Sequence, residues 1–288
     1  MKKIISYFLA ILLAVFLIAT IFILITSNTV LNENFILKLL DENHYYELLS
    51  TSIKSGIEEY IQQSGLDNDV FENIYTEENL KQDVKTIITN TYNNTETEIN
   101  ANVVKDNLRR NIDNYLNENN VTLSRQEQKN IDDFVEEVGE VYEKEISQPV
   151  YLDTAQKVII RAKKVISQYG RYVYIAALVS AILILVINIK SIRDVLKYFA
   201  ISLLTSAFFI IIGITLIRVR VNIDNLLILN SSFTLLITNG IKKIIQKFMY
   251  TGAGFTLFAT VFIPFTLKNS KNTQKNVKTI AKHMQNSV

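Results

Sequence analysis

The chain has 288 residues, of which 49% are hydrophobic and 20% are charged, with a formal net charge of +2. Because it contains no cysteine, disulfide frameworks, thiolate metal sites and cysteine nucleophiles are excluded. Two histidines and eight glycines argue against a histidine-rich metal protein and a collagen-like chain, respectively. The hydrophobic residues are gathered into long uncharged blocks, which is typical of a membrane protein.

The first block comprises residues 4–26, which carry no charge and are preceded by Lys2 and Lys3. A signal peptide would have an apolar core of about 7–15 residues followed by a small-x-small cleavage site. This block is longer and no Ala-x-Ala closes it. We therefore expect an uncleaved anchor helix that crosses the membrane once; the alternative is a segment that is cleaved as a signal peptide.

An acidic region the length of a domain, residues 27–171, follows the anchor. It contains 26 acidic and 15 basic residues, a net charge of −11, whereas the rest of the chain carries +13. Apolar residues recur in it at three- and four-residue spacing, which predicts helices. The predicted helices lie at residues 42–63, 80–88, 104–116 and 124–148. We therefore expect an all-α bundle over residues 27–153.

The last helix of this bundle has a recognisable beginning and end. Ser124 is followed three residues later by Glu127, the spacing of a capping box, in which each side chain accepts a hydrogen bond from the other residue's backbone N–H. The helix is expected to end before Pro149, because proline cannot continue the hydrogen-bonding pattern of a helix.

A further helix is predicted to lead from the acidic region into the membrane. From residue 154 onward apolar residues recur at helical spacing, directly into a second uncharged block at residues 172–189. A continuous helix over residues 154–190 would be roughly 55 Å long at 1.5 Å per residue. We expect it to act as a stalk between the bundle and the second span.

Two more uncharged blocks, residues 198–217 and 248–267, have 20 residues each. This matches the ~20 residues that a helix needs to cross the hydrocarbon core. The last block contains Gly252, Gly254 and Pro264, residues that membrane helices tolerate. We therefore expect an all-α integral membrane protein with four transmembrane helices.

Small residues recur at four-residue spacing within the second and third blocks. They form the pairs Ala176 with Ser180, Ala177 with Ala181, and Ser202 with Ser206. Such pairs permit close packing of membrane helices.

The stretch before the last block has two interpretations. Residues 226–240 are apolar, but a run of 15 residues is more typical of a re-entrant or interfacial segment. Residues 241–248 have the spacing of an amphipathic helix at a membrane surface. The alternative, in which residues 226–245 cross the membrane, would place the C-terminal tail outside the cell.

The distribution of lysine and arginine predicts the orientation. With the N-terminus inside, the inner segments hold ten basic residues against one acid, whereas the short outer loop holds five basic residues. We therefore expect both termini in the cytoplasm and residues 27–171 outside. The expected order begins with an anchor (1–26), an acidic extracytoplasmic domain (27–153) and a stalk with the second span (154–189). A short cytoplasmic loop with the third span (190–217) and an outer interfacial loop with the amphipathic segment (218–247) follow. The chain then continues with the fourth span (248–267) and a basic cytoplasmic tail (268–288).

Ten basic residues lie next to the outer membrane surface in this topology, and we call them the basic collar. They are Lys157, Arg161, Lys163, Lys164, Arg171, Arg218, Arg220, Lys242, Lys243 and Lys247. Anionic lipid headgroups attract such residues, each contributing about 1 kcal/mol near a charged surface. We interpret the collar as a contact for anionic lipids or cell-wall polymers; the alternative is that the acidic domain docks onto it.

No motif with catalytic spacing is present, nor a phosphate-binding loop or a dinucleotide fingerprint. We therefore expect no catalytic residues, no cofactor, no metal site and no nucleic-acid partner. The expected partners are the lipid bilayer, anionic lipids or polymers at the collar, and a protein that binds the acidic domain.

The segment from Asn34-Phe35 through His44-Tyr45-Tyr46, followed by the predicted bundle helices, resembles uncharacterised four-span membrane proteins of Gram-positive-type bacteria. The layout is also similar to permease-like subunits of ABC systems of the cell-division and MacB type. The first resemblance implies no particular activity, and the second implies an ATPase partner.

From this layout we expect a non-enzymatic, multi-pass protein of the bacterial cell envelope that interacts or senses through its acidic extracytoplasmic domain. The alternative is a subunit for transport or mechanotransmission.

Overall fold

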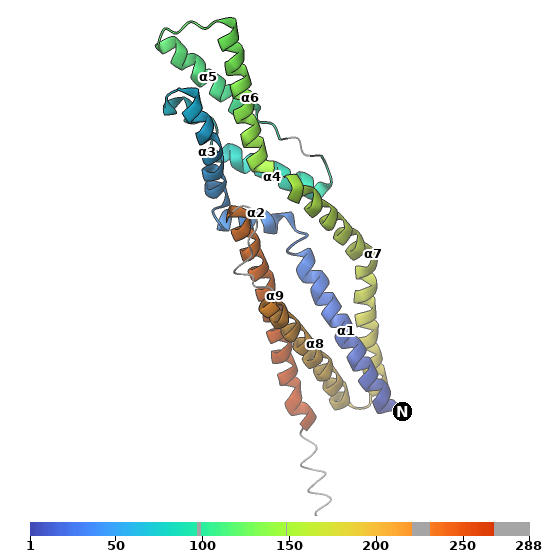
Figure 1. Cartoon of the computed structure of the whole chain (residues 1–288). Helices are drawn as coiled ribbons and strands as arrows, with labels where there is room; N and C mark the ends of the chain where they lie inside the picture. Colours follow the sequence, from blue (N-terminus) through green and yellow to red (C-terminus); the bar gives the residue numbers. More distant parts are fainter. Residues whose placement is uncertain (97–98, 148, 221–230, 268–288) are drawn as a thin grey trace, which may run out of the picture. The chain divides into compact units, whose positions relative to one another are not determined.

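The computed structural model describes residues 1–96, 99–147, 149–220 and 231–267, with the backbone alone for 149–153, 231–233 and 265–267. The described residues contain helices and no strand, which confirms the all-α fold class (Figure 1). The elements in chain order are α1 (Lys2–Ser27), α2 (Glu33–Glu42), α3 (Tyr45–Ser64), the 3₁₀ helix η1 (Asn68–Phe71), α4 (Glu77–Asn93), α5 (Asn102–Glu118), α6 (Arg125–Ser147), α7 (Pro149–Asn188), α8 (Ile192–Arg220) and α9 (Ser231–Leu267).

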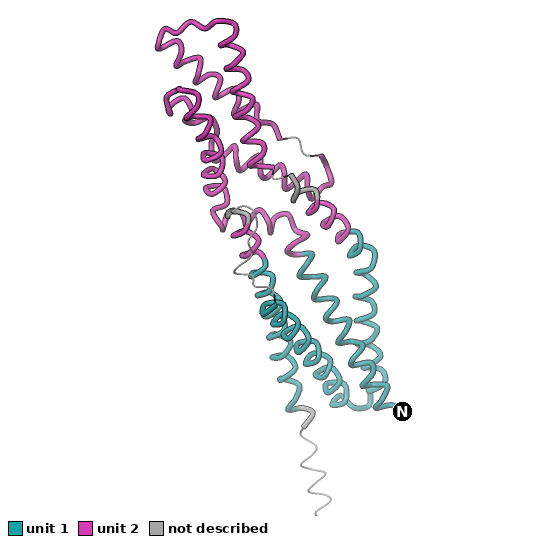
Figure 2. The backbone as a smooth tube through the Cα atoms, viewed as in Figure 1, with its two compact units in different colours: residues 1–27, 164–225, 241–288 teal, residues 28–163, 226–240 magenta. Residues whose placement is uncertain are grey.

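The chain forms two compact units (Figure 2). Unit 1 comprises Met1–Ser27, Lys164–Asn225 and Ile241–Val288, and unit 2 comprises Asn28–Lys163 and Leu226–Gly240. Two helices, α7 and α9, therefore contribute residues to both units. Unit 2 contains the acidic region, with 26 acidic and 13 basic residues.

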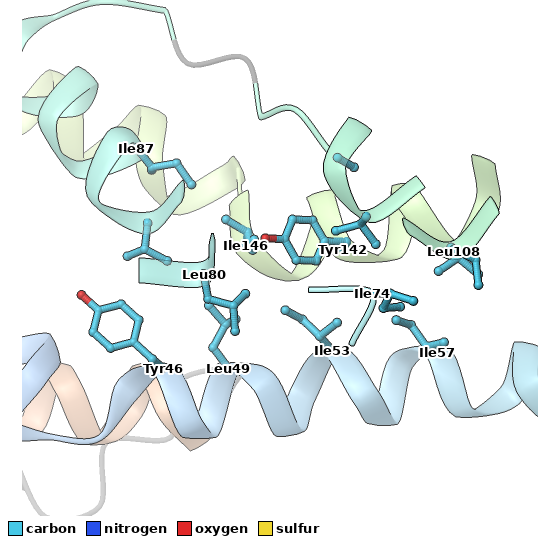
Figure 3. Close-up of a cluster of buried hydrophobic side chains, with 14 of the residues drawn as sticks. Tyr46, Leu49, Ile53, Ile57, Ile74, Leu80, Ile87, Leu108, Tyr142 and Ile146 are labelled. Atoms are coloured by element: carbon cyan, nitrogen blue, oxygen red, sulfur yellow. The ribbon is translucent and has the colours of Figure 1, made fainter. Parts of the chain in front are cut away.

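The core of unit 2 is a cluster of buried apolar side chains from α2 to α6, together with Leu236 of α9. The face of α3 that the sequence pattern identified supplies Leu49, Ile53 and Ile57, each at most 2% exposed. Figure 3 shows these side chains pointing toward the apolar residues of α4, α5 and α6. The helical spacing of apolar residues thus produces the amphipathic faces that this core requires.

Local capping signals fix where several of these helices begin and end. At α6, the Ser124 N–H donates to Glu127 Oε2 at 2.7 Å and the Glu127 N–H donates to Ser124 Oγ at 3.3 Å, which confirms the expected capping box. A second box, between Thr76 and Asn79, begins α4 and was not recognised in the sequence. Gly65 ends α3 with a φ of 69°, a left-handed conformation that favours glycine.

Two glycines allow α6 to approach its neighbours closely. A Cβ atom at Gly56 of α3 would lie 2.9 Å from Val141 Cγ1 of α6. A Cβ atom at Gly139 of α6 would lie 2.1 Å from Lys105 Cε of α5, so the lysine stem crosses the position that a side chain would fill. The backbone of α6 is therefore closer to both partners than side chains at these positions would permit.

The main helix pair of unit 1 is α1 with α8, packed through small residues. Ala10 and Ala14 of α1 are 0% exposed, as are Ser202 and Ser206 of α8. The Ser202 hydroxyl donates to the Ala10 carbonyl at 2.8 Å, and the Ser206 hydroxyl donates to the Ala14 carbonyl at 3.1 Å. The serine pair noted in the sequence thus lies at a close helix–helix contact, as is typical of membrane proteins.

A buried polar pair adds a contact between α1 and α7. Ser6 is 0% exposed and Asn188 is 2% exposed. The Asn188 side-chain amide donates to Ser6 Oγ at 3.0 Å and to the Ile184 carbonyl at 2.9 Å. Both polar groups are hydrogen-bonded, so neither leaves a buried donor or acceptor unsatisfied.

Among the described residues, three helices are long and apolar enough to cross a membrane: Lys2–Ser27, Thr154–Asn188 and Ile192–Arg220. They contain the first and third predicted spans and all but the last residue of the second. The expected fourth span, residues 248–267, lies within α9 and stays a prediction. Residues 221–230 of the outer loop and the tail, residues 268–288, lie outside the described residues.

Helix α9 is continuous across the boundary that the sequence pattern placed at residue 247. Its first part belongs to unit 2, where Leu236 is 7% exposed within the core and the Asn239 side-chain amide donates to Asn43 Oδ1. Leu236 of this apolar run therefore packs in a protein core. Their expected re-entrant or interfacial placement stays a prediction.

Candidate functional site

Unit 2 contains an open groove of about 1040 Å³ between α3 and residues 68–77, which we call the α3 groove. Its α3 side runs from Tyr46 to Gln62, a length of about 24 Å at 1.5 Å per residue. The aromatic and aliphatic side chains that line it are Tyr46, Ile57 and Ile74, which are buried, and Ile61, Phe71 and Tyr75, which are half-buried. The groove thus has an apolar base that solvent reaches from one side.

The wall opposite α3 is held in place by two asparagines of α5. Asn111 Nδ2 donates to the carbonyls of Val70 and Glu72 at 2.9 and 3.1 Å. Asn107 Nδ2 donates to the carbonyl of Ile74 at 3.1 Å. Because these asparagines lie one helical turn apart, a single face of α5 holds both η1 and the irregular segment that follows it.

Aromatic contacts connect the same wall to the core and to α3. The Phe71 ring packs edge-on against Phe134 of α6, with ring centroids 6.0 Å apart. The Tyr75 hydroxyl donates to the Ser50 carbonyl at 3.1 Å. The groove is therefore formed by ordered contacts within unit 2, which is the preorganisation that a binding site requires.

The charges that line the α3 groove are predominantly negative. Its charged side chains are exposed and comprise four glutamates and one lysine: Glu47, Glu58, Glu72, Glu77 and Lys54. Glu47 pairs with His44 at 3.2 Å and Glu77 pairs with Lys81 at 2.9 Å. Glu58 and Glu72 form no ion pair with any residue that the structure describes. These two carboxylates are available to a cationic ligand.

The tyrosine side chains near the groove remain protonated at physiological pH. Burial, with a smaller contribution from Asp41, raises the pKa of Tyr46 to about 12. Burial also raises the pKa of Tyr75. Both phenols are therefore neutral, and they contribute aromatic surface and hydroxyl hydrogen bonds rather than charge.

No metal-binding arrangement stands out in the part of the chain that the structure describes, which holds no group of three or more His, Asp and Glu side chains placed for an ion. One polar contact in the core of unit 2 joins α6 to α4. Tyr142 is 1% exposed, and its hydroxyl donates to Asp83 Oδ2 at 2.7 Å, which with burial raises the pKa of the phenol.

Of the five basic collar residues on α7, one contacts another helix of unit 2 and four are exposed. Lys163 Nζ donates to the Tyr92 carbonyl at 2.8 Å and lies 5.0 Å from the centre of the Tyr92 ring, so it caps the end of α4. The other four, Lys157, Arg161, Lys164 and Arg171, are exposed, and their spacing places them on one side of α7. The α7 part of the collar is therefore a stripe of four cations.

The remaining collar residues lie at the ends of other helices. Arg218 and Arg220 are exposed in the last turn of α8, where cations interact favourably with the helix dipole. Lys242 and Lys247 of α9 are exposed, and Lys243 is half-buried.

The sequence pattern did not reveal the α3 groove. Residues 65–76 show neither helical nor strand periodicity, which is typical of a connecting loop. The available signal was the pair Asn107 and Asn111, whose amides lie one helical turn apart on α5.

Comparison with known proteins gives no relative, since no protein-family model, curated protein or solved structure matches the chain.

Proposed function

We propose that this protein is a non-enzymatic, multi-pass membrane protein of the bacterial cell envelope that binds a partner through unit 2 on the extracytoplasmic side. The α3 groove is the observation that carries the proposal, because it combines an apolar base, a preorganised wall and uncompensated carboxylates. The three described helices that are long and apolar enough to cross a membrane support the anchoring role. The proposed topology has four spans and both termini in the cytoplasm.

The arrangement of α7 and α9 favours a second candidate, in which binding is transmitted to the membrane. Each of these helices has residues in both units, and α7 extends over 40 residues. A continuous helix shared by two units is a suitable element for mechanotransmission. The resemblance to permease-like subunits suggests the same role, with an ATPase as the expected partner.

Cysteine labelling in intact cells tests the topology on which the proposal depends. The natural chain has no cysteine, so single cysteines can be placed at Thr122, in the exposed turn between α5 and α6, and at Ser287 in the tail. A membrane-impermeant maleimide should label Thr122→Cys and should label Ser287→Cys only after the cells are permeabilised. If both react in intact cells, residues 226–245 cross the membrane and the four-span topology is wrong.

We further propose that the exposed cations of α7 contact anionic lipid. Replacement of Lys157, Arg161, Lys164 and Arg171 by glutamine should weaken the binding of anionic lipid to the detergent-solubilised full-length protein. Each charge contributes about 1 kcal/mol, and added salt should reduce the difference between the proteins. Replacement of Lys163 alone should leave binding unchanged, because that lysine contacts Tyr92. Equal binding by the wild type and the fourfold variant would exclude a lipid contact.

A further inference from the structure

The geometry of the α3 groove points to one class of ligand, and we infer that it binds a cationic amphipathic helix supplied by a partner outside this chain. The inference rests on the proposed function, because it names the partner of the extracytoplasmic unit. It requires that the groove fit a helix, that it prefer positive charge, and that it be free to receive a ligand.

The dimensions of the groove fit a helix of about four turns. Its α3 side is about 24 Å long, which corresponds to about 16 residues at 1.5 Å per residue. A helix that binds in a groove does so through apolar residues three and four positions apart, which face the groove together. Ile61, Phe71 and Tyr75 line the groove and are only half-buried, so they provide apolar surface for such a stripe.

An extended peptide would fit less well. Addition of a strand requires free backbone groups along an edge, and the described part of unit 2 contains no strand. The wall segment does not substitute for one, because three of its carbonyls already accept hydrogen bonds from Asn107 and Asn111. A helix satisfies its own backbone and needs none of these groups.

The charge of the groove selects a cationic ligand over an anionic one. Four glutamates and one lysine line it, and unit 2 as a whole holds twice as many acidic as basic residues. Glu58 on α3 and Glu72 on the opposite wall have no ion-pair partner among the described residues. A helix seated between them can therefore direct cationic side chains to both walls. Anionic polymers and lipid headgroups are repelled by the same carboxylates.

The test uses the full-length protein in nanodiscs of neutral phosphatidylcholine, with a cysteine at Ser55 in the groove or at Thr122 outside it. Ser55 is exposed and lines the groove, so a bound helix should shield it from maleimide. The probe is a synthetic amphipathic helix of leucine and lysine of about 16 residues. Two further peptides serve as controls: one with the same composition in a non-amphipathic order, and one with glutamate in place of lysine.

At saturation, the amphipathic peptide should slow maleimide labelling at Ser55→Cys by about tenfold and leave Thr122→Cys within about twofold, because a bound helix covers Ser55 and leaves Thr122 exposed. Glu58→Gln with Glu72→Gln should raise the half-protecting peptide concentration about three- to tenfold, as expected for two exposed ion pairs. The matched double variant Glu137→Gln and Glu140→Gln, on the exposed face of α6 and outside the groove, should not change it.

Several outcomes would overturn the inference. Equal shielding by either control peptide, absence of shielding, or shielding that does not depend on Glu58 and Glu72 would each contradict it. An unreactive Ser55→Cys in the absence of peptide would show that the groove is already filled by this chain or by a second copy. None of these outcomes changes where Thr122→Cys is labelled in cells, so failure of the inference is distinguishable from failure of the proposed function.

Discussion

Replacement of Leu108 by alanine is expected to lower the unfolding free energy of unit 2 by about 2–5 kcal/mol, the range for truncation of a buried leucine. Leu108 of α5 is 0% exposed and lies in the cluster that joins α5 with α3, α4 and α6. Its loss removes apolar contacts and leaves a cavity that the neighbouring helices fill only in part. Urea unfolding of the full-length protein in detergent, followed by circular dichroism, measures the effect.

A matched control lies on the same helix. Val103 of α5 is 51% exposed, so its replacement by alanine should change the unfolding free energy by less than about 0.5 kcal/mol. If the two variants unfolded at the same urea concentration, the cluster would not be the core that stabilises unit 2.

The second large effect is expected in the membrane helices. Leucine in place of Ala14 should destabilise the contact between α1 and α8 by about 1–3 kcal/mol, the range for inserting extra methylene groups into a packed interface. Ala14 is 0% exposed, and its carbonyl accepts a hydrogen bond from Ser206 at 3.1 Å. A larger side chain at this position displaces α8 and breaks that bond.

Loss of helical structure on titration of the purified protein with sodium dodecyl sulfate measures this destabilisation. Ala253 of α9 is exposed, so Ala253→Leu introduces the same change in size without a packed neighbour. We expect the Ala14 variant to lose structure at a lower detergent fraction than the wild type and the Ala253 variant to match the wild type. Identical curves for all three proteins would contradict the close packing of α1 with α8.

The helices of unit 2 were predictable because each buries one face. The apolar spacing around Ile53, Leu80, Leu108 and Tyr142 defines the buried faces of α3, α4, α5 and α6, and all four side chains are at most 1% exposed. The short helix α2 was missed, since its ten residues contain too few turns for a clear periodic pattern.

The groove could not be predicted, because it depends on contacts between residues distant in the sequence. Asn107 and Asn111 read as polar positions on a solvated helix, yet they bind the backbone of residues 70–74. The role of Leu236 was equally hidden, since an apolar run indicates burial without indicating whether lipid or protein covers it. Its place in the core of unit 2 follows only from the three-dimensional structure.

The most direct test of an outward-facing binding groove is the labelling of Ser55→Cys in intact cells with and without the leucine–lysine peptide. At peptide concentrations that leave the membrane intact, we predict that the impermeant maleimide labels this cysteine without peptide and that the peptide slows the reaction by about tenfold, as for a ligand that covers the site. Labelling that requires permeabilised cells would contradict the outward orientation. Labelling at an unchanged rate in the presence of peptide would contradict the groove as the binding site.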